Sequence, residues 1–173
     1  STLMQSIIKL PQPVIAQIHG TAAAAGCQLV ATCDLAIAST TAKFATPGVN
    51  IGLFCSTPMV AVSRKLPRKK MMEMLLMGDL VDAETALEFG LINRVVAYGQ
   101  LEETVSNYAN KIKEKSPLVL KIGKEAFYNQ IDMPLADAYK YTAEVMTQNM
   151  LVQDANEGIN AFIEKRAPTW TGK

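Results

Sequence analysis

The chain has 173 residues, 49% of them hydrophobic, and its basic and acidic side chains nearly cancel to a formal net charge of +1. This length is ample for one domain with its own core. The charge balance argues against a nucleic acid or a membrane surface as partner. No apolar run approaches the ~18 residues that a membrane-spanning helix needs, and no targeting segment is evident.

Residues 1–39 predict short apolar strands separated by helices. Residues 3–10 predict the end of a helix, stopped by the prolines at 11 and 13. Residues 13–20 predict a strand, residues 21–33 a helix of small residues, and residues 35–39 a second buried strand. Near-continuous apolar strands separated by a helix are typical of a sheet covered on both faces.

Residues 40–58 change character, because they hold two prolines, two glycines and several hydroxyl side chains. They predict a long loop with a short strand or turn inside it, which is a common place for function. Helices are expected over residues 58–66 and 69–78. Asp82 is the expected N-cap of a further helix that ends at Gly90, and residues 91–96 predict a strand.

The chain after residue 99 predicts helices only. Apolar residues share one face in residues 101–112, Pro117 begins a helix that runs to Gln130, and two more helices follow. Four methionines at helical spacing predict packing in a core or a subunit interface: Met71, Met72, Met74 and Met77. The basic run at residues 64–70 fits either a solvated helix end or an anion-binding edge.

Three cysteines, Cys27, Cys33 and Cys55, lie among apolar or small residues. Their odd number, without the spacing of a disulfide framework, predicts reduced thiols and an intracellular protein. Cys55 and the adjacent Ser56 could suggest a nucleophile, but no base lies nearby in the sequence. A small-residue turn that shapes a pocket is the interpretation we prefer.

The segment "HGTAAAAGCQLV", residues 19–30, places small residues where a helix begins directly after a strand. Such a helix start presents unpaired backbone N–H groups and the positive end of the helix dipole. Small residues let a ligand oxygen reach these donors, as in an oxyanion hole. Tight packing of the helix on the strand accounts for the same residues, so the residues alone leave both interpretations open.

Four blocks of the sequence resemble the crotonase superfamily of enoyl-CoA hydratases and isomerases, and within it the enoyl-CoA hydratase domain-containing proteins. The blocks are "PVIAQIHGTAAAAGCQLVATCDLAIAS", "AKFATPGVNIGLFCSTP", "MGDLVDAETALEFGLINRVV" and "EGINAFIEKR". The resemblance implies an α/β fold: part of a spiral of ββα turns in residues 1–98, then a helical trimerisation region in residues 99–173. It covers the C-terminal two thirds of a family member, so we expect a further segment upstream.

The resemblance also implies a ligand and an assembly. We expect an acyl-CoA thioester, with coenzyme A as part of the substrate and neither a separate cofactor nor a metal, and a homotrimer or hexamer. The expected role is in fatty acid metabolism, in the bacterial cytoplasm or the mitochondrial matrix, without membrane insertion.

The resemblance assigns the thioester carbonyl to two backbone N–H donors. One donor maps to Ala25, between Ala24 and Gly26, which stand where the family often has three glycines. The other donor and the loop along the adenosine end of CoA are expected upstream.

Both glutamates of the family's hydratases are replaced in this chain: Gln28 stands at the first position and Gly48 at the second. A glutamine can orient a water or a carbonyl but cannot take a proton at neutral pH. The residues alone agree, because Asp34 is the only carboxylate in residues 1–72, and general acid–base catalysis needs a titratable group within reach. We expect Asp34 to cap or to bind a loop.

The remaining site residues follow from the matched blocks. Gly48, Val49 and Phe54 are expected to contact the substrate. Phe162 and Lys165 match an aromatic residue and a lysine that reach a neighbouring subunit's CoA, although a surface lysine beside a packed Phe would give the same sequence. His19, the one histidine, is expected to be structural.

Three functions remain open from the sequence. The first is an acyl-CoA enzyme whose chemistry is not ordinary hydration, such as a lyase, an isomerase or a thioester hydrolase. The second is a non-catalytic CoA-binding or scaffolding protein. The third is a structural subunit with no ligand.

Overall fold

The computed structural model describes residues 1–173, which form two compact units. Unit 1 comprises residues 1–8 and 14–109, and unit 2 comprises residues 9–13 and 110–173. The domain division expected between residues 98 and 99 stays a prediction.

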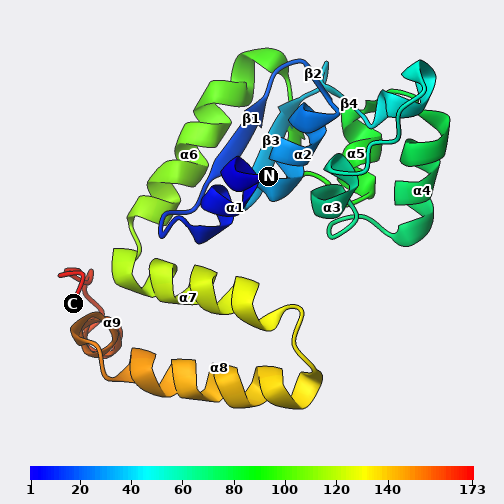
Figure 1. The fold of residues 1–173 in the computed structure, drawn as a ribbon. Helices are drawn as coiled ribbons and strands as arrows, with labels where there is room; N and C mark the ends of the chain where they lie inside the picture. Colours follow the sequence, from blue (N-terminus) through cyan, green and yellow to red (C-terminus); the bar gives the residue numbers. More distant parts are fainter. The chain divides into compact units, whose positions relative to one another are not determined.

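Unit 1 contains all the strands and most of the short helices (Figure 1). In chain order its elements are α1 (Thr2–Lys9), β1 (Ile15–Ile18), β2 (Thr21–Ala23), α2 (Ala25–Thr32), β3 (Leu35–Ser39), β4 (Lys43–Ala45), the 3₁₀ helix η1 (Pro47–Ile51), α3 (Pro58–Val62), α4 (Arg68–Met77), β5 (Val81–Asp82), α5 (Ala83–Glu88), β6 (Arg94–Val96), the 3₁₀ helix η2 (Tyr98–Gln100) and the first part of α6 (Leu101–Lys113).

The strands form two small sheets, with the orders β1-β3-β6 and β2-β4-β5. In the first sheet all pairs are parallel, and Ile15 lies opposite Leu35. In the second, β2 and β4 are parallel, with Thr21 opposite Lys43, while β5 is antiparallel. Each strand of the pair β1–β2 is therefore matched by a strand of the next pair, β3–β4, and this stacking is the arrangement that a ββα spiral predicts.

The core of unit 1 lies between α2, the sheets and α3–α5. Its fully buried side chains include Phe44, Val62 and Cys27. Met71 and Met74 belong to this core, whereas Met72 and Met77 on the same helix are largely exposed. The methionine stripe thus divides between packing and surface.

The helix that we expected over residues 21–33 is wrong in its first part. Thr21–Ala23 form β2 and pair with Lys43–Ala45, and the helix begins only at Ala25. Alanine favours helices locally, but pairing with a strand 22 residues further on decides the conformation here. The loop predicted at residues 40–58 contains the short strand and turn that we expected there, as β4 and η1.

Several local predictions are confirmed. Asp82 caps α5, because its Oδ1 accepts a 2.8 Å hydrogen bond from the Thr85 N–H. Gly90 ends that helix region with a left-handed φ of 83°. The strand expected at residues 35–39 appears as β3, and that expected at 91–96 is shorter, because β6 begins at Arg94.

Unit 2 is helical, as predicted. It contains the end of α6, then α7 (Pro117–Gln130), α8 (Leu135–Met150) and α9 (Gln153–Ile163) (Figure 1). Ser116 caps α7 by accepting a hydrogen bond from the Val119 N–H. None of the helices in the chain is both long and apolar enough to span a membrane.

Candidate functional site

The connection from β2 to α2 contains an unusual backbone conformation at Ala24. Its φ is 49° and its ψ is −112°, a region that non-glycine residues rarely adopt. The Ala24 N–H donates to the Ala45 carbonyl on β4 at 2.9 Å, and the Ala24 carbonyl accepts from the Gln28 N–H at 3.0 Å. These backbone bonds join the sheet to the helix start and hold the strained turn.

Ala25 is the first residue of α2, and its N–H donates to no acceptor within the chain. The free N–H groups in the first turn of a helix point away from its N-terminus, where the dipole favours negative charge. Ala25 is exposed, and Gly26 beside it has room even for a Cβ, whose nearest contact would be 3.8 Å away. The backbone N–H that we predicted as a donor is therefore unpaired, and a ligand can reach it.

Gln28 lies one helical turn from Ala25, at a spacing that puts both on one face of α2. The residue is half-buried, and its side-chain amide makes no hydrogen bond within the chain. Its backbone carbonyl accepts from the Thr32 hydroxyl at 2.7 Å. The amide is therefore available to a ligand, but the position offers no base.

Gly48 has no space for any side chain. A Cβ there would lie 2.9 Å from the Leu53 carbonyl oxygen and 3.0 Å from the Cys55 sulfur. Its N–H donates to Cys55 Sγ at 3.3 Å, and its carbonyl accepts from the Leu53 N–H at 2.9 Å. The second glutamate position is therefore filled by the chain itself, and the polar backbone groups of Gly48 are already used.

The neighbours of Gly48 shape this loop. A Cβ on Gly78 would lie 2.9 Å from Val49 Cγ2, so Val49 packs closely on Gly78, and Asn50 donates to the Gly78 carbonyl at 3.1 Å. Phe54, by contrast, is 44% exposed. Of the two predicted contacts beside Gly48, Phe54 offers a free apolar surface, and Val49 is partly used in packing against the end of α4.

The cysteines are free and buried, as the sequence predicted. Burial raises the pKa of the Cys27 thiol to about 12, against an opposing hydrogen bond from the Ala45 backbone and with a small contribution from Cys55. A thiol in this state is not a nucleophile at neutral pH. Cys55 serves as the acceptor for Gly48, which agrees with a role in shaping the turn.

Asp34 has the structural role that we expected, whereas the side chain of His19 does not. Asp34 Oδ2 accepts from the Val14 N–H at 2.7 Å and so fixes the entry to β1. The His19 imidazole is exposed, and the residue's structural part is its carbonyl, which accepts from the hydroxyls of Ser39 and Thr41.

Sequence reasoning missed Thr46, which joins β4 to η1. The residue is fully buried, and its hydroxyl has no hydrogen-bond partner. A buried polar group without a partner is costly. Its position next to Ala45 and Gly48 could not be recognised without the pairing of β2 with β4.

The end of α9 carries the other two predicted ligand contacts. Phe162 is 85% exposed, and the exposed Lys165 ammonium makes no hydrogen bond or ion pair. Lys165 has a left-handed φ of 55°, and Ala24 is the only other non-glycine residue with a positive φ. The N–H of Lys165 donates to the Phe162 carbonyl and that of Arg166 to the Ala161 carbonyl, which is the Schellman arrangement of a helix end.

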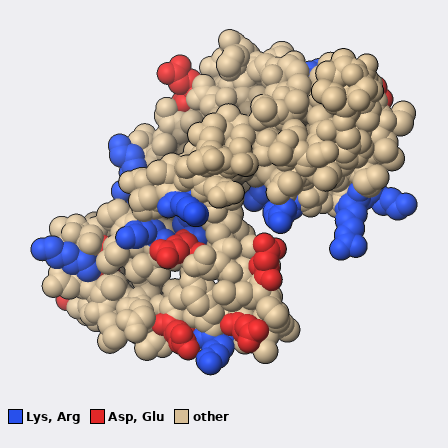
Figure 2. Space-filling view, viewed as in Figure 1, with Lys and Arg blue, Asp and Glu red and all other residues tan.

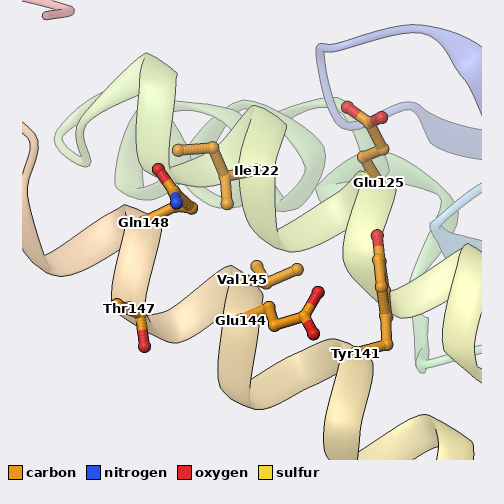
Figure 3. A pocket seen from close by; sticks show the side chains of 7 residues that line it. All are labelled: Ile122, Glu125, Tyr141, Glu144, Val145, Thr147 and Gln148. Atoms are coloured by element: carbon orange, nitrogen blue, oxygen red, sulfur yellow. The ribbon is translucent and has the colours of Figure 1, made fainter.

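Hollows occur in the surface of unit 2. A groove of about 560 Å³ lies between α7 and α8, where Ile122 and Val145 face each other and the Glu125 carboxylate points away from α8 (Figure 3). Another, of about 500 Å³, is lined in part by Phe162, Trp170 and Lys115. Charges of both signs mix over α7–α9 on the face shown in Figure 2, and no cluster of His, Cys, Asp and Glu could hold a metal ion.

Comparison with known proteins gives the class of protein that this fold and site define. All of residues 1–173 match the family described as enoyl-CoA hydratase/isomerase. The chain therefore belongs to the enoyl-CoA hydratase/isomerase family and has the crotonase fold.

Particular relatives agree with this assignment. Over 169 residues the chain is 50% identical to the mitochondrial enoyl-CoA hydratase domain-containing protein 3 of Xenopus laevis, which covers 98% of this chain and 58% of that protein. It is 36% identical over 166 residues to (E)-benzylidenesuccinyl-CoA hydratase of Thauera aromatica, covering 95% of this chain and 65% of that protein. The crystal structure of human enoyl-CoA hydratase domain-containing protein 3 superposes with a TM-score of 0.96 at 48% identity, covering 98% of this chain and 67% of that one. The chain thus spans less than two thirds of the length of these two curated relatives.

Proposed function

We propose that the protein binds an acyl-CoA thioester and holds its carbonyl oxygen at the start of α2, without catalysing ordinary hydration. The observation that carries this proposal is the strained turn at Ala24, which leaves the Ala25 N–H free at a helix N-terminus. A backbone donor in this position stabilises negative charge on a carbonyl oxygen. Phe54 and the amide of Gln28 are the groups that we expect beside the bound acyl chain.

Hydration requires a base that this part of the protein does not supply. Gln28 cannot take a proton, and a side chain at position 48 would collide with the Leu53 carbonyl and Cys55. If the protein turns over thioesters, the reaction is therefore one that polarisation of the carbonyl promotes, such as thioester hydrolysis, or one that uses a group from outside these 173 residues. Its place would be fatty acid metabolism.

The name of the Thauera aromatica relative supports a CoA ester as the ligand class, because that protein is a hydratase of a CoA thioester by its name. The nucleotide end of CoA would meet Phe162 and Lys165 of a neighbouring copy in a homotrimer or hexamer. Large apolar side chains exposed on α8 and α9 support such an assembly: Leu135, Tyr139, Met146, Met150, Ile159 and Ile163. We place the protein in the mitochondrial matrix or the bacterial cytoplasm, since the relatives include mitochondrial and bacterial proteins.

The test supplies the full-length protein with a panel of acyl-CoA esters and follows both enoyl absorbance and free thiol. We expect binding of the esters and no hydration of crotonyl-CoA. Rapid hydration of crotonyl-CoA that depends on Gln28 would contradict our proposal that the protein does not catalyse ordinary hydration.

A second candidate function is a CoA-binding protein without turnover. The lack of space for a side chain at Gly48 favours this second candidate, because a single substitution there cannot restore the second carboxylate. Calorimetry separates the two candidates: binding of CoA without turnover of any thioester supports the second, and turnover excludes it. If CoA does not bind at all, both give way to a structural subunit.

A further inference from the structure

The segment after α9, residues 166–173, folds back along its own helix. Arg166 makes a bidentate ion pair with Glu157, with Nη–Oε distances of 2.7 and 2.9 Å, and its Nε donates to Glu164. Glu157 Oε1 also accepts from the Thr169 N–H at 2.7 Å. Bidentate pairs of this kind fix geometry as well as charge. We call residues 166–173 the tail.

The far end of the tail is held by Asp154, which is almost completely buried. Its carboxylate accepts from the Ser116 hydroxyl at 2.5 Å, from the N–H and hydroxyl of Thr171, and from the Gly172 N–H, while its own N–H donates to the Lys173 carbonyl. Between these two anchors, Trp170 donates to the Glu114 carbonyl at 2.7 Å. The tail is therefore fixed to unit 2 at several points.

Two cations stand next to each other where the tail leaves α9, and they differ in their surroundings. Arg166 is neutralised by Glu157 and Glu164, whereas the Lys165 ammonium has no partner. The backbone of Lys165 is left-handed, which costs about 1 kcal/mol or more for a residue with a Cβ and persists only where neighbours enforce it. Two backbone bonds of the Schellman arrangement close this turn, and the ion pair of Arg166 with Glu157 fixes the chain directly after it.

The hollow beside this turn provides room for a ligand. Phe162 and Trp170, with Ile159 and Met150, form its apolar part, and Lys115 lies at its border. A flat aromatic ring with an attached phosphate suits the exposed phenyl ring of Phe162 and the unpaired ammonium of Lys165, three residues further along the chain.

We infer that Glu157 and Arg166 are positioning residues: they hold the Lys165 ammonium where it binds the phosphate at the nucleoside end of CoA. This inference rests on the function proposed above. The pKa of Glu157 is lowered to about 2 by its hydrogen bonds to Arg166 and Thr169, so the pair keeps both charges at every physiological pH.

The experiment measures the affinity of the full-length protein for CoA and for dephospho-CoA, which lacks the 3′-phosphate, by calorimetry. The variant is Glu157→Gln, and the charge-matched control is Glu144→Gln on the exposed face of α8. Both changes make the protein more positive by one charge, so electrostatics alone predicts equal or tighter binding of anionic CoA. We expect E157Q instead to bind CoA about five-fold more weakly, the effect of losing one well-placed charge contact, with dephospho-CoA unchanged and E144Q like the wild type.

Each outcome bears on a different step. Failure of the wild type to bind CoA overturns the proposed function itself. Binding of CoA by the wild type, with E157Q equal to E144Q, overturns the positioning role and leaves the proposed function intact. Equal weakening of CoA and dephospho-CoA in E157Q, together with a lower unfolding temperature, also overturns it, because loss of structure would account for both effects.

Discussion

The two strained positions of the chain, Ala24 and Lys165, lie in different units and are held by different forces. Ala24 is held by backbone hydrogen bonds to Ala45 and Gln28, at the junction of a sheet with a buried core. Lys165 lies at the surface, where two backbone bonds close the turn and the next residue adds an ion pair with Glu157. The strain at Ala24 depends on the fold of unit 1. The strain at Lys165 depends in part on charges that pH and salt can change.

The strongest test of the turn at Ala24 removes only the hydrogen-bond donor that follows it, the Ala25 N–H. Proline is tolerated as the first residue of a helix because its missing N–H has no helical partner there. Ala24→Gly/Ala25→Pro should therefore keep α2 while abolishing the N–H that we assign to the thioester oxygen. Where the full-length protein turns over a thioester, its kcat should fall by about 10²–10³-fold relative to Ala24→Gly alone.

The control for this comparison is the helix itself. Circular dichroism of the two variants should coincide, because both contain the same glycine at position 24. An unchanged kcat in the proline variant would remove Ala25 from the site and leave tight packing as the explanation of the small residues.

The loop at Gly48 tests how rigidly unit 1 holds the site. Gly48→Ala places a Cβ 2.9 Å from the Leu53 carbonyl oxygen, and overpacking of this kind costs about 1–3 kcal/mol. Gly20→Ala is the matched control, because nothing lies within 4 Å of its added Cβ. Urea unfolding should show a lower midpoint for G48A and nearly none of that loss for G20A; equal midpoints would mean that the loop yields easily and that a side chain fits there.

The sequence predicted the elements that local signals decide and missed those that depend on distant partners. Pro117, Asp82 and Gly90 marked helix ends correctly because capping and ring geometry act within a few residues. β2 was missed, since alanines favour a helix and only the pairing with β4 makes them a strand.

The candidate site divides in the same way. The resemblance pointed to Ala25, Gln28 and Gly48, but no local pattern shows that Leu53 and Cys55 fill the space beside Gly48. Nor could the sequence show that Glu157, nine residues before Arg166, is the residue that pairs with it, since this pairing requires the tail to reverse direction.

The turn at Lys165 should respond to acid, and the turn at Ala24 should not. The pKa of Glu157 is lowered from 4.5 to about 2 by Arg166 and Thr169, and that of Asp154 is lowered chiefly by the Ser116 hydroxyl. A carboxyl whose pKa is lower in the folded state stabilises it above the unfolded pKa, and this stabilisation is lost as pH falls through the folded pKa. The tail should therefore loosen as pH falls from about 4.5 towards 2.

Fluorescence of Trp170, the one tryptophan of these residues, reports this loosening. E157Q removes the titrating carboxyl next to Arg166 and should reduce the change between pH 4.5 and 2. The start of α2, whose contacts are backbone bonds, should keep its helical circular dichroism over the same range. A fluorescence change that E157Q leaves unaltered would assign the acid response to Asp154 alone.

The smallest effects come from relieving the strain with glycine. Glycine adopts left-handed φ without a Cβ penalty, and α5 already ends in this way at Gly90, with the same Schellman bonds as the end of α9. Ala24→Gly and Lys165→Gly should each raise the free energy of unfolding by roughly 1 kcal/mol, because relief of strain exceeds the added entropy of the unfolded chain. Ala23→Gly, in the strand just before, should instead lower it by about 0.5–1 kcal/mol. If the strain at Lys165 is enforced by the Glu157–Arg166 pair, the gain from Lys165→Gly should become smaller in high salt or in an E157Q background, whereas the gain from Ala24→Gly should stay constant, since no charge holds that turn.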